Sequence, residues 1–243
     1  MNKNKQNIKV MTFNIHHGKG TDKRVDLKRI SEVIAKSNAD IIGLNEVDRH
    51  FSARSQFLDQ IKILASEINF YYVFCPSITK YRKKKKMVSQ YGNALLSRFP
   101  ISTYKTYSFN LKSKFTEGRS ILDVTLDVKG KMLSCFVSHL SLHPVLHKKQ
   151  SQFIFNQANE PAIILGDWNM KYRSSKWRRI TQRYTDVWDM KGKGNGNTFP
   201  STNPRTRLDY IFVSKSIKIH EIMVFDDIPL ASDHLPVVAT ITI

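Results

Sequence analysis

The chain has 243 residues, with 39 lysine and arginine residues against 20 aspartate and glutamate residues, a formal net charge of +19. Hydrophobic residues make up 41% of it, no stretch approaches the ~20 apolar residues that cross a bilayer, and no apolar signal core follows the basic N-terminus; these features argue against a transmembrane or secreted protein. The two cysteines, Cys75 and Cys135, are too few for a disulfide framework, so we expect buried free thiols in a cytoplasmic protein.

The first half of the chain alternates predicted strands with two amphipathic helices. A helix over residues 25–36 carries its apolar residues on one face, and Asp26 fits the N-cap position. A second helix, over residues 57–68, has the same periodicity. Strands are predicted over residues 8–13, 41–44 and 70–74, the last of them ended by Pro76.

The second half is richer in strands. Apolar residues alternate over residues 120–128, and the Lys129-Gly130 turn predicts a hairpin to a strand over 131–139. The other predicted elements are strands over 93–97, 101–109 and 162–165 and helices over 145–156 and 174–183. No linker or internal repeat divides the chain, so we predict one domain, residues 1–243, in which two mixed sheets pack together with helices outside.

Several apolar runs carry charged or amide side chains at one end. A side chain in that place stands on a rigid support at the rim of a sheet. The residues are Asn14, Glu46, His139, Asp167 and Asn169 after their runs, and Asp209, Asp233 and His234 before theirs. Carboxylates, amides and imidazoles gathered at one rim would suit phosphate chemistry.

Seven short motifs, in order along nearly the whole chain, resemble those of the endonuclease/exonuclease/phosphatase superfamily with the DNase-I-like fold. They are TFNIHHG at 12–18, LNEV at 44–47, YGNALLS at 91–97, SHL at 138–140, GDWN at 166–169, RLDYIF at 207–212 and SDHLPV at 232–237. The resemblance implies an α/β fold, a four-layer α/β/β/α sandwich of two packed mixed sheets. It also implies a phosphoesterase that depends on a divalent metal.

Glu46, Asp233 and Asn14 are the predicted metal residues. Mg²⁺ prefers carboxylate and water oxygens and few protein ligands, and Mn²⁺ accepts the same donors. Glu46 and Asp233 would bind the ion, and Asn14 would add a neutral oxygen or orient a metal-bound water. Taken alone, Glu46 could equally be a surface carboxylate; the accompanying motifs favour the metal role.

The predicted catalytic residues are Asp167, Asn169, Asp209, His234 and His139. Asp167 would orient or deprotonate the attacking water, and Asn169 would donate its amide to a phosphoryl oxygen. Asp209 would orient His234 and favour its imidazolium form. The resemblance implies that His139 is a second imidazole at the phosphate. The alternatives are a capping turn for Asp167 and Asn169 and a purely structural Asp–His pair.

Two positions depart from the family pattern, and two other histidines are expected to lie elsewhere. Many nucleases of the family have an acidic residue where this chain has His16, which bears on the affinity and number of metal ions. No acidic residue stands at Val88-Ser89-Gln90, where some members carry a glutamate that orients the residue corresponding to His139. His143 and His147 are predicted to be surface residues, with Pro144 interrupting a helix between them.

Two stretches combine cations with aromatic residues. Residues 80–86 hold six cations, and residues 171–179 hold five, directly after the Asp167 loop. In the second stretch, Tyr172, Arg173 and Trp177 are the predicted substrate-binding residues, because cations neutralise phosphates and aromatic rings stack on bases. Both stretches could instead be solvated loops or contact anionic lipid headgroups.

These features together predict a divalent-metal-dependent phosphodiester hydrolase. The net charge of +19 favours nucleic acid, and DNA in particular, as the substrate of a monomeric enzyme. A phospholipid, sphingolipid or phosphoinositide esterase acting at a membrane surface is the first alternative. A non-catalytic module that binds nucleic acid or membrane is the second, and the full set of polar residues argues against it.

Overall fold

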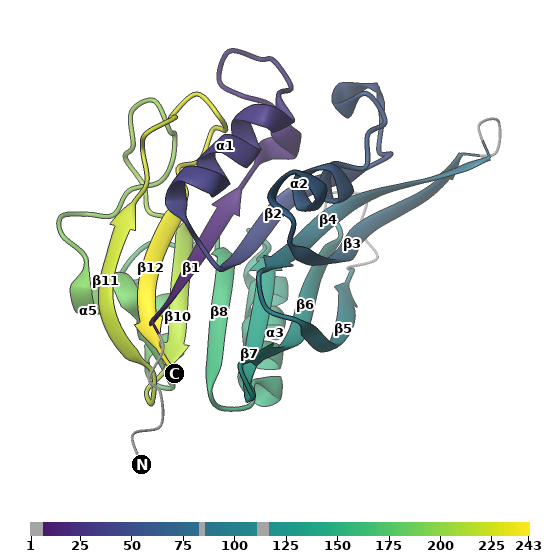
Figure 1. Cartoon of the computed structure of the whole chain (residues 1–243). Helices are drawn as coiled ribbons and strands as arrows, with labels where there is room; N and C mark the ends of the chain where they lie inside the picture. The colour runs from purple at the N-terminus through teal and green to yellow at the C-terminus, as the bar shows by residue number, and fades with distance from the viewer. Residues whose placement is uncertain (1–6, 83–85, 111–116) are drawn as a thin grey trace.

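The computed structural model describes residues 7–82, 86–110 and 117–243, which form two six-stranded sheets (Figure 1). In spatial order the first sheet holds β11 (Lys218–Val224), β12 (Val237–Thr242), β1 (Asn7–Asn14), β2 (Ile41–Arg49), β4 (Met87–Ser97) and β3 (Tyr71–Arg82). The second holds β5 (Ile101–Phe109), β6 (Arg119–Val128), β7 (Lys131–His139), β8 (Ala162–Asp167), β10 (Asp209–Ser214) and β9 (Tyr184–Asp186).

Helices cover the outer face of each sheet. The first sheet packs against α1 (Leu27–Ser37) and α2 (Gln60–Ile68), and the second against α3 (Pro144–Gln157) and α4 (Ser175–Thr181). The short α5 (Val187–Lys191) contacts β10 and β11, one strand from each sheet. The arrangement is the predicted α/β/β/α sandwich of two mixed sheets (Figure 1).

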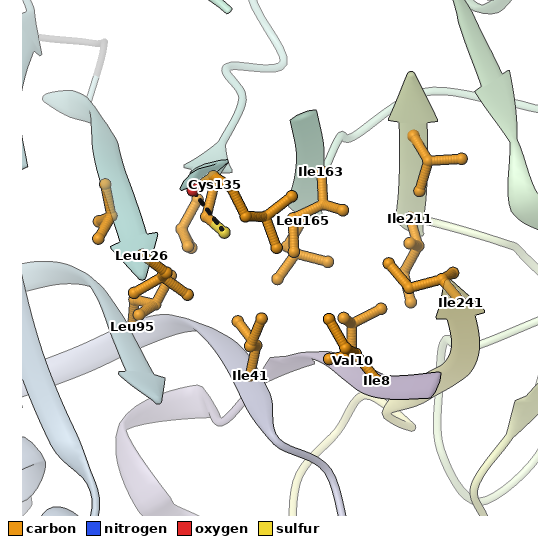
Figure 2. Packing of buried hydrophobic residues seen from close by; sticks show 14 of the residues in the cluster. Ile8, Val10, Ile41, Leu95, Leu126, Cys135, Ile163, Leu165, Ile211 and Ile241 are labelled. Carbon is orange, nitrogen blue, oxygen red and sulfur yellow. Dashed lines mark hydrogen bonds between the residues drawn. The ribbon is translucent and has the colours of Figure 1, made fainter. Parts of the chain in front are cut away.

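The main apolar core lies between the two sheets (Figure 2). Val10 and Ile41 from the first sheet face Leu126, Cys135 and Leu165 from the second, and each of these side chains is fully buried. Cys135 and the other cysteine are free thiols in buried positions, as expected from their apolar surroundings. This rigid core fixes the ends of the central strands relative to one another.

Local sequence signals explain several element boundaries. Asp26 caps α1 by accepting a hydrogen bond from the Arg29 backbone N–H at 3.1 Å, as predicted. The β6–β7 hairpin turns at Lys129 and Gly130, which both have positive φ, as a type I′ turn requires. The helix expected over 57–68 begins only at residue 60, after the N-cap Asp59.

The expectation that Pro76 ends its strand is wrong. β3 continues to residue 82, and its pairing with β4 shifts register between Pro76 and Ile78. A proline fits a strand at a bulge or at a sheet edge, and β3 is the edge strand of its sheet. The long β3–β4 hairpin carries part of the cationic run 80–86 away from the sheets (Figure 1), and residues 83–85 of that run lie outside the described residues.

Among the residues that the structure describes, no helix is long and apolar enough to span a membrane.

Candidate active site

The strand order brings the predicted site residues to one rim of the sandwich. In the second sheet, parallel pairing of β7 with β8 sets His139 beside Asp167, and antiparallel pairing of β8 with β10 sets Asp209 on the other side of Asp167. In the first sheet, parallel pairing sets Asn14 beside Asn45. His139, Asp167 and Asp209 therefore form one row across three neighbouring strands. Asn14 and Asn45 of the other sheet face this row.

The Asp167 carboxylate is the centre of this group. Its Oδ2 accepts a hydrogen bond from Asn14 Nδ2 at 3.2 Å, and it lies 3.5 Å from His139 Nε2 and 3.9 Å from His234 Nε2. Gly166 before it has φ of +147°, and a Cβ there would meet the Ser138 carbonyl oxygen of the neighbouring strand. Only glycine lets β8 approach β7 closely enough to set Asp167 in this position.

Asp209 and His234 form the predicted acid–imidazole pair. His234 Nδ1 lies 2.8 Å from Asp209 Oδ2, which also accepts a hydrogen bond from the Thr198 hydroxyl at 2.6 Å. His234 reaches the rim because β12 begins beside the end of β1, with Val237 opposite Thr12. Burial alone would lower the pKa of His234, but the charge of Asp209 and its hydrogen bond, with the charges of Asp167 and Asp233, raise that pKa to about 10. His234 is an imidazolium at neutral pH.

Burial shifts the pKa values of Asp167 and His139 in opposite directions. It raises the pKa of Asp167 to about 7, helped by the negative charge of Asp209 and opposed by His234 and by hydrogen bonds from Asn169 and Asn14. Burial, with the cationic Arg119 and His234 nearby, lowers the pKa of His139 well below its ordinary value. The site therefore combines a carboxylate that can accept a proton at neutral pH, a neutral imidazole and a charged imidazole.

Asn169 and Asp167 share one tight turn. The Asn169 backbone N–H donates to Asp167 Oδ1 at 3.0 Å, and its side-chain amide donates to the Leu140 carbonyl at 3.0 Å. Asn169 has φ of +43°, a left-handed conformation that asparagine tolerates better than most residues. One amide hydrogen thus holds the side chain in place, and the role of the other toward a phosphoryl oxygen stays a prediction.

Neutral side chains that the sequence analysis did not identify hold the rim together. Asn45 Oδ1 accepts a hydrogen bond from the Asp167 backbone N–H at 2.9 Å, and its Nδ2 donates to Asn93 Oδ1 at 2.8 Å. Asn93 in turn donates to the Ser120 carbonyl. This buried chain of amides connects the two sheets directly under the Asp167 carboxylate. Asn45 and Asn93 stand inside the LNEV and YGNALLS motifs, which is the one sequence signal that could have identified them.

Glu46, Asp233 and Asn14 lie around His16. Asn14 Nδ2 donates to Glu46 Oε1 at 3.1 Å and to Asp167 Oδ2 at 3.2 Å, so this amide links two carboxylates. Asn14 Oδ1 accepts a hydrogen bond from the His16 backbone N–H. His16 Nδ1 lies 3.6 Å from Asp233 Oδ1. Carboxylate oxygens at half-buried positions are donors that divalent cations accept, so the residues present fit such an ion.

The predicted substrate-binding residues form one cluster beside a cavity of about 540 Å³. The Tyr172 and Trp177 rings contact edge to face at 5.1 Å, and the guanidinium groups of Arg173 and Arg207 lie over the Tyr172 ring at 5.0 and 4.7 Å. The Trp177 indole N–H donates to Asp186 at 2.7 Å. The structure thus brings the three residues together, and the Tyr172 ring already has a cation and an aromatic partner.

His147 is a correction to the sequence analysis, whereas His143 is exposed as expected. Pro144 does not interrupt a helix between them; it is the first residue of α3, where its missing N–H costs nothing. His147 then faces inward and is 1% exposed, with Nε2 2.9 Å from the Trp168 carbonyl oxygen. His147 supports the loop that follows Asp167.

Replacing His147 with glutamine is expected to make the protein less sensitive to acid. Burial and the nearby Lys176 charge lower the pKa of His147 to about 4, opposed by the hydrogen bond with Trp168. The unfolded chain binds this proton near pH 6.5, so stability falls as pH drops from 6.5 to 4, by roughly 3 kcal/mol for this group. Urea unfolding at pH 7 and pH 4.5 should show a smaller loss in the variant than in the wild type. His143→Gln is the control and should behave as wild type.

Comparisons with known proteins identify the family of the chain. The sequence model of the endonuclease/exonuclease/phosphatase family matches residues 11–234. The uncharacterized protein YbhP of Escherichia coli K12 is 22% identical over 219 residues, covering 86% of this chain and 85% of YbhP.

Two solved structures share the fold. The endonuclease/exonuclease/phosphatase of Beutenbergia cavernae has a TM-score of 0.84 and 23% identity, covering 98% of this chain and 72% of that one. The mannosyl-6-phosphatase Bt3783 of Bacteroides thetaiotaomicron has a TM-score of 0.76 and 18% identity, covering 97% and 100%. The family match extends over nearly the whole chain and includes every residue at the rim. The chain belongs to the endonuclease/exonuclease/phosphatase family, whose members are hydrolytic phosphoesterases.

Proposed function

We propose that this protein is a divalent-metal-dependent phosphodiester hydrolase that acts on nucleic acid. The observation that carries the proposal is the buried Asp167 carboxylate, flanked by a neutral imidazole at His139 and by the Asp209-paired imidazolium of His234. A structural ion pair needs neither a second imidazole nor a carboxylate with a pKa near 7.

The residues of this chain divide the reaction between them. Asp167 takes a proton from the attacking water, whose oxygen forms the new bond to phosphorus as the bond to the leaving oxygen breaks. His234 donates hydrogen bonds to the negative charge that grows on the phosphoryl oxygens, and His139 and Asn169 orient the phosphate. A divalent cation bound through Glu46 and Asp233 would neutralise phosphate charge. The leaving oxygen takes its proton from solvent.

The charge distribution supports nucleic acid as the substrate. Lys171 and Arg205 line the 540 Å³ cavity, and in the sequence the lining residues Lys171 and Arg207 stand two positions from Asn169 and Asp209. Exposed cations of this kind position a phosphate backbone without reading its sequence. The net charge of +19 adds long-range attraction for a polyanion.

A substrate panel tests the proposal. Purified protein is incubated with plasmid, single-stranded and duplex oligonucleotides, RNA, liposomes, inositol phosphates and sugar monophosphates, each with Mg²⁺, with Mn²⁺ and with EDTA. Cleavage of a nucleic acid that EDTA abolishes supports the proposal. Intact nucleic acid together with hydrolysis of a sugar monophosphate would overturn it in favour of a small-molecule phosphatase, and headgroup release from liposomes would favour the lipid alternative.

The double substitution Lys171→Gln/Arg173→Gln is expected to weaken binding of a duplex and to reduce its salt dependence. Loss of two phosphate contacts should lower the slope of log K against log salt by about 2. Fluorescence anisotropy over a range of salt concentrations measures both quantities, with Ca²⁺ in place of Mg²⁺. The control, Lys215→Gln/Lys218→Gln, removes the same charge at the β10–β11 turn, at the opposite end of the strands. Equal effects of the two double variants would show that only net charge matters.

A further inference from the structure

The turn after β1 places two imidazoles beside Glu46. His16 and His17 lie in the 3-10 turn η1 (His16–Gly18), and each offers a nitrogen within 4.8 Å of the other and of a Glu46 carboxylate oxygen. The turn is held from two sides: the His16 backbone N–H donates to Asn14 Oδ1, and the Gln60 amide donates to the His17 carbonyl at 2.7 Å. The two rings meet edge to face, with centroids 4.5 Å apart.

Both imidazoles carry a buried nitrogen without a hydrogen-bond partner among the described residues. These atoms are His16 Nδ1 and His17 Nδ1, and the His17 residue is 7% exposed. Asp233 Oδ1 lies 3.6 Å from His16 Nδ1, and this distance is too long for a hydrogen bond. Buried polar atoms are nearly always paired, so two unpaired ring nitrogens in one turn point to a missing ligand.

The backbone of the same three residues is strained. His16, His17 and Glu46 have φ of +45°, +47° and +59°, the left-handed region that L-residues other than glycine rarely occupy. Such conformations persist where the surroundings impose them and are concentrated at functional sites. Here the three residues with this conformation are also the three whose ligand atoms lie within 4.8 Å of one another.

The donor set is that of a transition metal. Two imidazole nitrogens and one carboxylate oxygen, with further positions open to water or substrate, are typical of catalytic zinc sites and of other borderline-soft ions, whereas Mg²⁺ takes oxygen ligands. Zinc–nitrogen bonds of ~2.1 Å require ligand atoms about 3.4 Å apart in a tetrahedral site. The three ligand atoms lie within 4.8 Å of one another, so binding requires them to move closer by at most about 1.4 Å.

We propose that His16, His17 and Glu46 together bind a transition-metal ion of the zinc class, so that the Glu46 centre has nitrogen ligands and prefers Zn²⁺ or Co²⁺ to Mg²⁺. The inference extends the proposed metal dependence of hydrolysis. Its test measures the metal alone without substrate, so a failure of the site and a failure of the hydrolase proposal are distinguishable.

The test is direct metal binding by the full chain after removal of bound ions. Titration with Co²⁺ should give one tight site with the visible absorption of low-coordinate cobalt, competed by Zn²⁺ and not by millimolar Mg²⁺. X-ray absorption of the protein with one equivalent of Zn²⁺ should show two imidazole ligands. A zinc ion held instead by Asp167, Asp209 and His234 would show one imidazole, and that result, or oxygen ligands only, would overturn the proposal.

His17→Asn is the matched variant, since asparagine tolerates the left-handed backbone but has no imidazole. It should weaken Co²⁺ binding by more than the ~10- to 100-fold that loss of an outer hydrogen-bond partner causes, and remove one imidazole from the zinc spectrum. His143→Asn changes an exposed histidine and should bind as wild type. Circular dichroism checks that the variant folds. If it does not fold, the X-ray absorption spectrum of the zinc-loaded wild type alone decides whether two imidazoles bind the metal. Unchanged binding by a folded His17→Asn variant would overturn the site.

Discussion

Replacing Asp167 with asparagine is expected to lower kcat for phosphodiester hydrolysis by about 1,000-fold or more, within the range lost with a general base. Asparagine has nearly the same shape and can still accept the hydrogen bond that the Asn169 backbone N–H gives to Oδ1. It cannot accept a proton from water. It also turns the acceptor that faces Asn14, His139 and His234 into a donor or a weaker acceptor.

Stability should not fall with the activity. The folded protein holds Asp167 as a buried carboxylate whose pKa lies above its ordinary value, so the ionised group destabilises the folded state above pH 7. Removing that charge is expected to leave the free energy of unfolding at pH 8 unchanged or higher. A large loss of activity without a loss of stability is typical of a residue selected for function rather than for folding.

Initial rates on a cleavable oligonucleotide and urea unfolding, both at pH 8, measure the two quantities. Asp123→Asn is the control, because burial also raises the pKa of this half-buried carboxyl, yet it stands within β6 opposite Phe136 rather than at the rim. Its kcat should match wild type. An Asp167→Asn variant that keeps more than a tenth of the wild-type kcat would show that another group receives the proton.

The rim of the site was predictable because its residues stand beside strongly apolar strands. His139, Asp167 and Asp209 each begin or end such a strand, and the pairing of β7, β8 and β10 then places them in register. The sandwich follows from the same runs, whose inward faces fill one core (Figure 2). Apolar periodicity reports the secondary structure and, together with strand order, the location of the site.

The parts that were missed depend on neutral polar groups and on tertiary context. Asn45, Asn93 and Thr198 hold the site by hydrogen bonds, and no charge or periodicity distinguishes them from residues of an ordinary turn. The sequence predicts a surface position for His147 if Pro144 interrupts the helix, but Pro144 is the first residue of α3 and His147 lies on the buried face of that helix, among other polar side chains. Pro76 was read as a strand end because a bulge cannot be seen in one strand without its partner.

Replacing Asp209 with asparagine is expected to shift the pH dependence of the reaction as well as its rate. In the wild type, kcat should rise as Asp167 ionises near pH 7 and fall as His234 loses its proton near pH 10. Burial lowers the pKa of His234, and the negative charge of Asp209 is the main influence that raises it. Without that charge the pKa of His234 drops, so the alkaline limb of the profile moves to lower pH.

The loss in kcat should therefore depend on pH, about 100-fold or more at pH 8.5 and smaller at pH 6.5, within the range expected for charge stabilisation by one group. Asparagine keeps an acceptor for His234 Nδ1 and for the Thr198 hydroxyl, and its amide nitrogen can take the place of Asp209 Oδ1, a buried atom without a hydrogen-bond partner among the described residues. The geometry of the pair is therefore retained while its charge is removed.

Rate profiles from pH 5.5 to 10 at saturating metal, with proton NMR titration of the His234 ring in the metal-free protein, test this directly. Thr198→Ala is the matched variant, because it deletes a hydrogen bond to Asp209 Oδ2 and keeps the carboxylate charge. Its alkaline limb should stay close to that of wild type, with a rate loss of about 10- to 100-fold, the size expected for one hydrogen bond to a charged group. If the Asp209→Asn profile is the wild-type curve scaled by a constant factor, Asp209 orients the ring without controlling its protonation, and the charge on the phosphoryl oxygens must be met by other groups.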